Sequence, residues 1–169
     1  MFARPHARHA QIAYVTNDLA AATALIERDY GAPGFWVFST GAASGGDAEA
    51  PTLKIALARV GGVEIELIEP QGSSAPLFSD SLPAGADLAI VFHHVAFRIE
   101  GPLAHWDQHL ASIDTARHKI VFGGAVGDDV RYCYTDERSA IGHLVEHVWM
   151  SPAILAQMAA AVPAYPRLT

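Results

Sequence analysis

The chain has 169 residues, of which 51% are apolar and 17% charged, and its formal net charge is −7. These proportions are typical of a globular domain with its own core, and they exclude a disordered chain. The negative charge disfavours nucleic acids and anionic membrane surfaces as partners, because both are bound by basic faces.

No apolar run approaches the roughly 20 residues that a membrane-spanning helix needs, and the segment 1–11 lacks the apolar core of a signal peptide. Cys133 is the only cysteine, which excludes an internal disulfide. We therefore expect a single-domain, cytoplasmic protein.

The first part of the chain predicts a strand, a helix and three further strands. Asp18 is a suitable N-cap for the helix, which Gly31 and Pro33 end. Gly61 and Gly62 separate the last two strands and predict a tight two-residue hairpin. The predicted strands are 9–16, 35–38, 53–60 and 63–69, with a Gly- and Ser-rich loop at 41–51.

The same order of elements recurs after a linker at 71–91. Pro102 stands in the first turn of the second helix, where its missing N–H costs nothing. A turn is expected at 123–129, and a last helix within 152–162. The predicted strands of this part are 92–99, 119–122, 130–135 and 143–149.

This recurrence predicts a single α+β domain over 1–169. The domain consists of two tandem βαβββ modules, at about 9–70 and 92–150, related by an approximate twofold axis. Such a relation would bring equivalent positions of the two modules together.

Four polar residues occupy equivalent places in strands that are otherwise apolar. Gln11 and His94 lie in the first strand of each module, and Glu66 and Glu146 lie in the last. The separations within the modules are nearly equal (66 − 11 = 55 and 146 − 94 = 52), as are those between the modules (94 − 11 = 83 and 146 − 66 = 80). The pseudo-symmetry would therefore gather all four side chains into one site.

A site of this composition favours a divalent metal ion. Glu146 shares its strand face with Leu144 and Val148, where an ionised carboxylate is costly unless it is paired or bound to a metal. The mixed nitrogen and oxygen ligands suit Zn, Ni, Co or Mn better than copper, and such an ion could polarise a carbonyl group. Taken singly, Glu66 is also consistent with a solvated sheet face, and His94 with a hydrogen-bonded core histidine.

The stretches around these positions are QIAYV at 11–15, DL at 18–19, EIELIEP at 64–70, HHVAF at 93–97 and GHLVE at 142–146. In them the chain resembles the vicinal-oxygen-chelate superfamily, which includes glyoxalase I and methylmalonyl-CoA epimerase. The resemblance implies a curved mixed sheet around a metal-site cleft. It also implies one metal ligand at each of the four positions, with Gln11 where His is common.

The resemblance further implies proton transfer on the carbon beside a carbonyl that the metal polarises. Either Glu146 or Glu66 would be the base. Epimerases of this type have a second acid/base Glu in the third strand, and Lys54 stands there in this chain. Lys54 is therefore a candidate catalytic residue, either as a base or as a partner for an anionic substrate group.

Three more residues are candidates for substrate binding. Arg98 and Arg131 could bind a carboxylate or phosphate, because Arg makes bidentate contacts to such groups, and surface ion pairs are the alternative. Trp36 could line an apolar pocket, with core packing as the alternative.

We therefore expect a metal-dependent isomerase or lyase that acts on a small-molecule carbonyl substrate, in a chain that can form homodimers. A non-enzymatic binding or sequestering protein on the same fold is the alternative. A third possibility is a ring-cleaving dioxygenase, whose Fe(II) takes two His and one carboxylate. Gln11 argues against the dioxygenase, and His9, two residues earlier on the same strand, is the residue that could support it.

Overall fold

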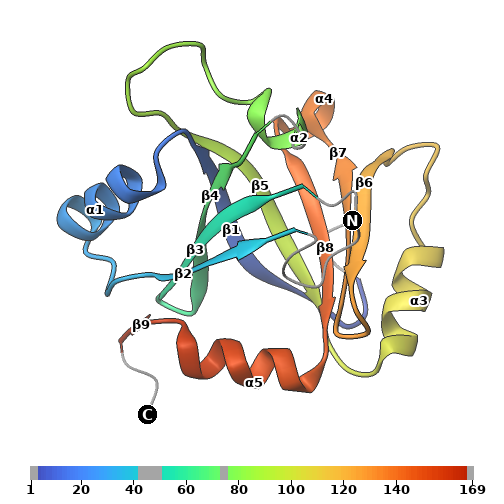
Figure 1. Ribbon diagram of the computed structural model, residues 1–169. Helices are drawn as coiled ribbons and strands as arrows, with labels where there is room; N and C mark the ends of the chain where they lie inside the picture. The colour runs from blue at the N-terminus through green and yellow to red at the C-terminus, as the bar shows by residue number, and fades with distance from the viewer. Residues whose placement is uncertain (1–3, 42–50, 73–75, 167–169) are drawn as a thin grey trace.

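One mixed β-sheet curls around a cavity in the computed structural model, which describes residues 4–41, 51–72 and 76–166 (Figure 1). The strands are ordered β2-β3-β4-β1-β5-β8-β7-β6, and β9 pairs with β3 outside this path. The strands are β1 (Ala7–Thr16), β2 (Trp36–Thr40), β3 (Leu53–Val60), β4 (Val63–Pro70), β5 (Ile90–Ile99), β6 (Ile120–Val126), β7 (Val130–Asp136), β8 (Leu144–Met150) and β9 (Ala164–Tyr165). The helices are α1 (Leu19–Tyr30), α2 (Pro76–Ser79), α3 (Leu103–Ala111), α4 (Arg138–Ile141) and α5 (Pro152–Ala161).

The sheet has the same construction on both sides of its centre. In one half β1 pairs with β4 in parallel, and in the other β5 pairs with β8 in parallel. The first strands of the two halves, β1 and β5, meet in antiparallel pairing at the middle of the sheet. This arrangement confirms the predicted α+β fold, with two βαβββ units on a curved mixed sheet.

Local sequence signals account for the ends of the elements. The side chain of Asp18 accepts a hydrogen bond from the backbone N–H of Ala21 at 2.9 Å, and Gly31 ends α1 with φ of 72°. Gly61 and Gly62 both have positive φ, 58° and 86°, and connect β3 to β4 in the tight hairpin that their pairing predicts.

The structure corrects the predicted turn at 123–129, since β6 continues to Val126. Gly123 and Gly124 lie inside this strand because there is no room for a side chain. A Cβ atom on Gly124 would lie 2.7 Å from the hydroxyl oxygen of Tyr132, and one on Gly123 would lie 3.0 Å from the carbonyl oxygen of the same residue. The glycines therefore mark a close approach between β6 and β7.

The predicted linker at 71–91 contains the short helix α2, whose Phe78 is almost fully buried. Most of the predicted loop at 41–51 lies outside the described residues. None of the helices in the described segments is long and apolar enough to cross a membrane.

The helices α1 and α3 cover the convex face of the sheet, and the cavity lies on the concave face. Leu19 and Ala22 of α1 pack on Ala56 and Leu67, and Trp106 of α3 belongs to a separate cluster in the second half. On the concave side, α5 contributes Met158 to the main core. The apolar faces of α1 and α3 thus fix the sheet from outside without filling its hollow.

Two irregularities interrupt the central strand pair. Ala13 pairs with His94 and Tyr14 with Phe92, so His93 is an extra residue in β5. A second shift lies between His9 and Gln11, where residue 10 is the extra residue of β1. Such β-bulges redirect side chains and are common beside active sites.

Candidate active site

The concave face encloses a cavity of about 390 Å³. Its lining residues come from both halves of the sheet and from α5, and most of them are apolar. The buried polar side chains Gln11, Glu66 and Glu146 line it as well, with exposed fractions of 3%, 8% and 9%. The cavity is thus an apolar space with a small group of buried polar side chains, which is the usual composition of a binding site for a small molecule.

His94 lies between the two carboxylates. Its ring is fully buried, and Nε2 is 3.5 Å from Oε2 of Glu66 and 3.6 Å from Oε2 of Glu146. The same Nε2 atom has no hydrogen-bond partner, which is uncommon for a buried polar atom. Three of the four predicted ligands are therefore gathered at one point, and Gln11 lines the same cavity.

A chain of hydrogen bonds fixes which nitrogen of His94 carries a hydrogen. Nε2 of His93 is 3.0 Å from the carbonyl oxygen of Leu77, which can only accept, so this Nε2 carries the hydrogen. Burial lowers the pKa of His93 to about 4, so the ring is neutral and its Nδ1 accepts. Nδ1 of His94, 2.8 Å away, must then donate. Nε2 of His94 consequently is the ring nitrogen that faces the two carboxylates and is available to bind a cation through its lone pair.

This arrangement favours a cation at the point where the three side chains meet. Burial, together with the charges of Glu146 and Glu64, raises the pKa of Glu66 well above its usual range. Tyr134 donates from its hydroxyl to Oε1 of Glu146 at 2.9 Å, and burial with the nearby carboxylates raises the pKa of Tyr134 well above its usual range. The tyrosine therefore stays protonated and holds one oxygen of Glu146.

The nitrogen and oxygen donors of this site fit a divalent metal ion, although their present separations are longer than those around a bound metal. In residues 4–41, 51–72 and 76–166, no three His, Cys, Asp or Glu side chains are already clustered as a metal site. Ligand atoms about 2.0–2.2 Å from a metal lie roughly 3 Å from one another. The separations of 3.5 and 3.6 Å around His94 Nε2 would have to contract by a few tenths of an ångström. The unpartnered Nε2 is the observation that favours such a ligand role.

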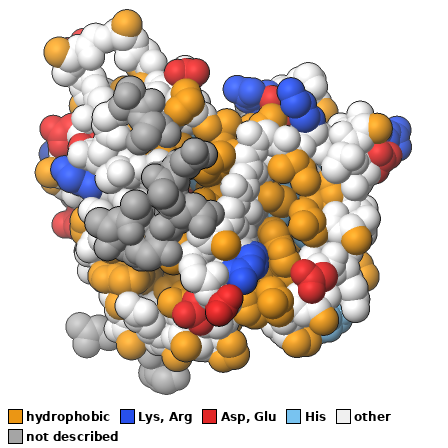
Figure 2. Space-filling model, turned by 45° about the vertical axis from the view of Figure 1, so that its right-hand side comes forward, with side chains coloured by type: hydrophobic (Ala, Val, Ile, Leu, Met, Phe, Trp, Pro, Cys, Tyr) orange, Lys and Arg blue, Asp and Glu red, His pale blue; other side chains and the backbone are white. Residues whose placement is uncertain are grey.

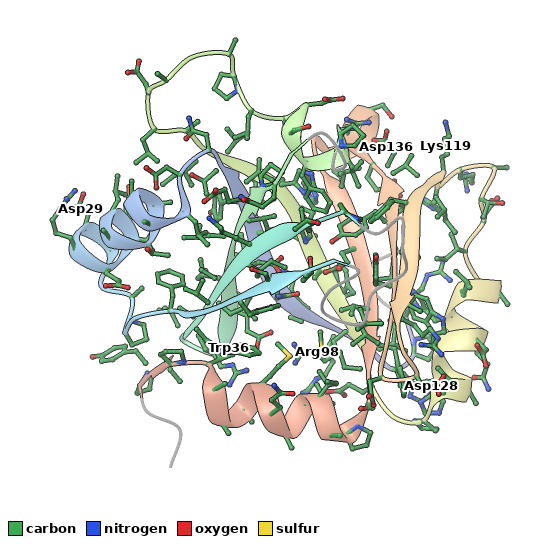
Figure 3. All side chains as sticks on the ribbon, in the orientation of Figure 1. Asp29, Trp36, Arg98, Lys119, Asp128 and Asp136 are labelled. Carbon is green, nitrogen blue, oxygen red and sulfur yellow. The ribbon has the colours of Figure 1, made fainter. Side chains whose placement is uncertain are left out.

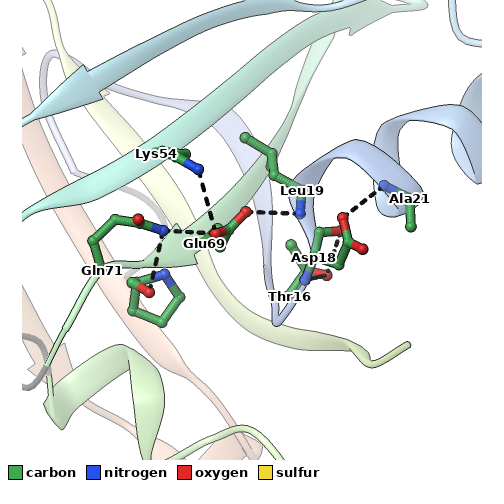
Figure 4. A network of polar contacts seen from close by, with 8 residues as sticks. Thr16, Asp18, Leu19, Ala21, Lys54, Glu69 and Gln71 are labelled. Carbon is green, nitrogen blue, oxygen red and sulfur yellow. Dashed lines mark hydrogen bonds and ion pairs between the residues drawn. The ribbon is translucent and has the colours of Figure 1, made fainter. Parts of the chain in front are cut away.

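Lys54 is not brought to this site. Its neighbours Leu53 and Ile55 line the cavity, and because side chains alternate along β3, Lys54 points to the convex face. There its Nζ lies 3.6 Å from Oε1 of Glu69, whose other oxygen accepts from the N–H of Leu19 at 2.9 Å (Figure 4). Lys54 thus belongs to a polar network at the start of α1 and lies outside the cavity lining.

The two predicted anion binders also lie away from the cavity lining. Arg98 donates to Oε1 of Glu64 at 2.6 Å, and Arg59 holds the other oxygen of the same carboxylate. Arg131 donates to the carbonyl oxygens of Gly127 and Val130, at the turn between β6 and β7. Both arginines are engaged by groups of the chain itself.

Trp36 does line the cavity, where its ring stacks on Phe38 with a centroid separation of 4.5 Å. The positions of Trp36 and Arg98 are labelled among the side chains in Figure 3. His9 lines a separate polar hollow with Arg8, Arg59 and Glu64. The bulge at residue 10 breaks the alternation between His9 and Gln11, so His9 does not share the cavity-facing side of β1 with Gln11.

Two residues of the site were missed by the sequence analysis. His93 was not assigned a role, because the bulge that buries it beside His94 leaves no mark in the hydrophobic pattern. Tyr134 is not singled out by the sequence analysis either, because an aromatic residue in a strand is typical of core packing. The register that pairs Tyr134 with Glu146 across β7 and β8 would have identified it, if the hairpin had been aligned residue by residue.

Comparisons with known proteins agree with the observed fold. Residues 10–134 match the model of the Glyoxalase/Bleomycin resistance protein/Dioxygenase superfamily. No sequence among curated proteins matches the chain significantly.

Solved structures share the fold at low sequence identity. A variant of Streptomyces coelicolor methylmalonyl-CoA epimerase in complex with 2-nitronate-propionyl-CoA has a TM-score of 0.61 and 18% identity, over 87% of this chain and 99% of that one. The methylmalonyl-CoA epimerase of Mycobacterium tuberculosis has a TM-score of 0.58 and 18% identity, over 92% and 97%. A hypothetical protein from Bacillus halodurans has a TM-score of 0.57 and 14% identity, over 87% and 96%. From the family match and the curled sheet of paired modules together, the chain belongs to the Glyoxalase/Bleomycin resistance protein/Dioxygenase superfamily.

Proposed function

We propose that the chain is a metal-dependent isomerase or lyase that moves a proton on the carbon beside a substrate carbonyl. The observation that carries this proposal is the unpartnered Nε2 of His94, buried between Glu66 and Glu146. Gln11, Glu66, His94 and Glu146 would hold a divalent ion such as Zn, Ni, Co or Mn. A bound ion would supply Lewis acidity toward the carbonyl oxygen.

The two carboxylates have different surroundings, which suggests different roles. Tyr134 holds Oε1 of Glu146, so this carboxylate is fixed in orientation and suits a ligand that does not move. We assign the proton transfer to Glu66, which lines the cavity from the opposite half of the sheet. The low exposure of both residues, 8% and 9%, would limit the access of bulk water to the reacting carbon.

Deuterium uptake tests this assignment. Zinc-supplemented protein in D₂O would be mixed with an apolar ketone, 4-phenylbutan-2-one, and the loss of hydrogen beside the carbonyl would be followed by NMR. We expect exchange above the protein-free rate, loss of exchange in Glu66→Gln, and loss of both exchange and bound metal in Glu146→Gln. Unchanged metal content and unchanged exchange in Glu146→Gln would remove this site from the reaction.

A non-enzymatic binding protein is the second candidate, and the position of Lys54 favours it. With Lys54 on the convex face, the described lining of the cavity has no acid/base group from the third-strand position that a two-base epimerisation uses. A protein of this kind would bind the ketone tightly without exchanging its hydrogens. The same NMR experiment, combined with a binding measurement, separates the two candidates.

Homodimer formation and a cytoplasmic location stay predictions. Sedimentation velocity over a range of protein concentrations would test the first.

A further inference from the structure

We propose that the cavity selects an uncharged carbonyl compound with an apolar body and discriminates against a ligand that carries a carboxylate on that body. This inference rests on the proposed function, because it names the substrate class of the same site. It departs from the acyl-CoA ligands of the epimerase structures that share the fold.

The walls of the cavity are the first observation. Trp36 stacks on Phe38 on one side, and the rings of Phe122 and Tyr132 lie 5.8 Å apart on the other. Met158 of α5 adds a flexible apolar contact. Figure 2 shows hydrophobic side chains gathered in a broad band on one side of the molecule. Aromatic faces and a methionine offer dispersion contacts to an apolar body and no charge to an ionic one.

The charges of the cavity are the second observation. Among the described residues that line it, the charged side chains are Glu66 and Glu146, and there is no Lys or Arg. The segment 42–50, which lies outside the described residues, contains no Lys, Arg or His in its sequence either. With a divalent ion bound, the two carboxylates would be balanced, and no positive charge would be left for a substrate carboxylate.

The cationic side chains that were candidates for binding a substrate carboxylate are engaged elsewhere. Lys54 pairs with Glu69 on the convex face, Arg98 with Glu64, and Arg131 with carbonyl oxygens of the β6–β7 turn. A ligand carboxylate inside the cavity would therefore lose its water without gaining a charged partner. This loss weakens binding more than the added contacts of the group can offset.

A pair of matched ligands tests the inference. The neutral probe is 4-phenylbutan-2-one, and the anionic one is 4-(3-oxobutyl)benzoate, which has the same skeleton with a carboxylate at the far end of the ring. Affinities would be measured by calorimetry on the protein as purified and again with added zinc. We expect the ketone to bind at least tenfold more tightly than the benzoate under both conditions. Equal or tighter binding of the benzoate, or no binding of the ketone, would overturn the inference.

Two variants locate the binding and identify its cause. Trp36 lies in the cavity, whereas Trp106 and Trp149 lie in the cluster beside α3, so Trp36→Phe should abolish the fluorescence change caused by the ketone. Gln157 is exposed on α5 and borders the cavity. Gln157→Lys should strengthen benzoate binding about tenfold, while the control Gln157→Met should not. An unchanged affinity in Gln157→Lys would contradict the role given to charge.

The experiment distinguishes failure of this inference from failure of the proposed function. Binding is measured without turnover, so a chain that binds the ketone but does not exchange its hydrogens keeps the inference and loses the enzymatic proposal. A chain that exchanges hydrogens while binding the benzoate as tightly as the ketone keeps the enzymatic proposal and loses the inference.

Discussion

Nδ1 of His93 accepts a hydrogen bond from Nδ1 of His94, and the two atoms are 2.8 Å apart. The bulge in β5 makes this contact possible, because it places adjacent imidazoles against each other. His93 is in turn held by the carbonyl oxygen of Leu77 at 3.0 Å. The short helix α2 therefore controls the orientation of a candidate metal ligand through one intermediate ring.

Replacing His93 should weaken metal binding, although His93 is not itself a candidate metal ligand. His93→Leu removes the acceptor for His94 Nδ1–H, and loss of such an outer partner typically costs about 10–100-fold in metal affinity. His93→Gln keeps an acceptor oxygen, so its loss of metal affinity should be smaller. Competition with a chromophoric chelator measures the affinities, and His105→Gln on α3 is the matched control. Equal affinities in His93→Leu and the control would show that the contact does not matter for the metal.

Tyr134→Phe should slow proton exchange while leaving the metal bound. The variant removes the hydroxyl that donates to Glu146 Oε1, and a hydrogen bond to a charged group contributes roughly 1.5–3 kcal/mol. We expect the exchange rate to fall about tenfold or more. The control is Tyr14→Phe, since Tyr14 packs on the cluster under α1. A Tyr134→Phe rate equal to that of the control would exclude a role for the hydroxyl.

Glu64→Gln should be strongly destabilising. The Glu64 side chain is 3% exposed and accepts from both Arg59 and Arg98, so its removal leaves two guanidinium groups without their carboxylate. Breaking a buried ion pair in this way costs roughly 3–5 kcal/mol. Urea unfolding measures the change. Glu100→Gln is the control, because the pair of Glu100 with Arg8 is exposed and should contribute no more than about 1 kcal/mol.

Stability should fall as the pH is lowered from about 6.5 to about 4. Burial lowers the pKa of His109 to about 4 and that of His147 to about 3, and the two rings share a hydrogen bond of 2.9 Å. The unfolded chain takes up protons below about pH 6.5, where the folded rings stay neutral. Stability is therefore complete above this pH, and each buried ring lowers it by up to about 1.4 kcal/mol per pH unit below it.

Urea unfolding at pH 7, 6 and 5 would measure this slope. In His147→Gln the slope should be smaller, because one buried histidine no longer differs between the folded and unfolded states. An identical slope in the variant would assign the acid sensitivity to other groups.

Lys54→Gln should leave proton exchange unchanged. The side chain is 48% exposed and points away from the cavity, so its contribution is confined to the pair with Glu69. The loss in stability should not exceed about 1 kcal/mol. A large loss of exchange activity in this variant would contradict the placement of Lys54 on the convex face.

The sequence was sufficient to predict the fold and the meeting of the candidate metal ligands. Strand and helix signals repeat at a spacing of about 80 residues, and equal spacings in two halves identify equivalent positions without knowledge of the structure. This is why His94, Glu66 and Glu146 could be expected to meet before their distances were known.

The surroundings of the ligands could not be predicted in the same way. Side-chain direction follows from strict alternation only where the ladder is regular, and the extra residue at His93 breaks it. Phe92, two residues before His94, would share its face in a regular strand, yet it contacts Tyr14 on the convex side and is 41% exposed. Lys54 was assigned to the site by resemblance to a third-strand residue, although its neighbours Leu53 and Ile55 already marked the opposite face.

The position of α5 has a consequence for how the protein matures on the ribosome. After α5, the backbone crosses to the first half of the sheet, where the N–H groups of Arg59 and Gly61 donate to the carbonyl oxygens of Pro163 and Tyr165. Every strand that walls the cavity is therefore synthesised before the helix that closes it. A nascent chain that has emerged only through β8 exposes the apolar hollow to solvent or to chaperones, and translation of α5 and β9 ends that exposure.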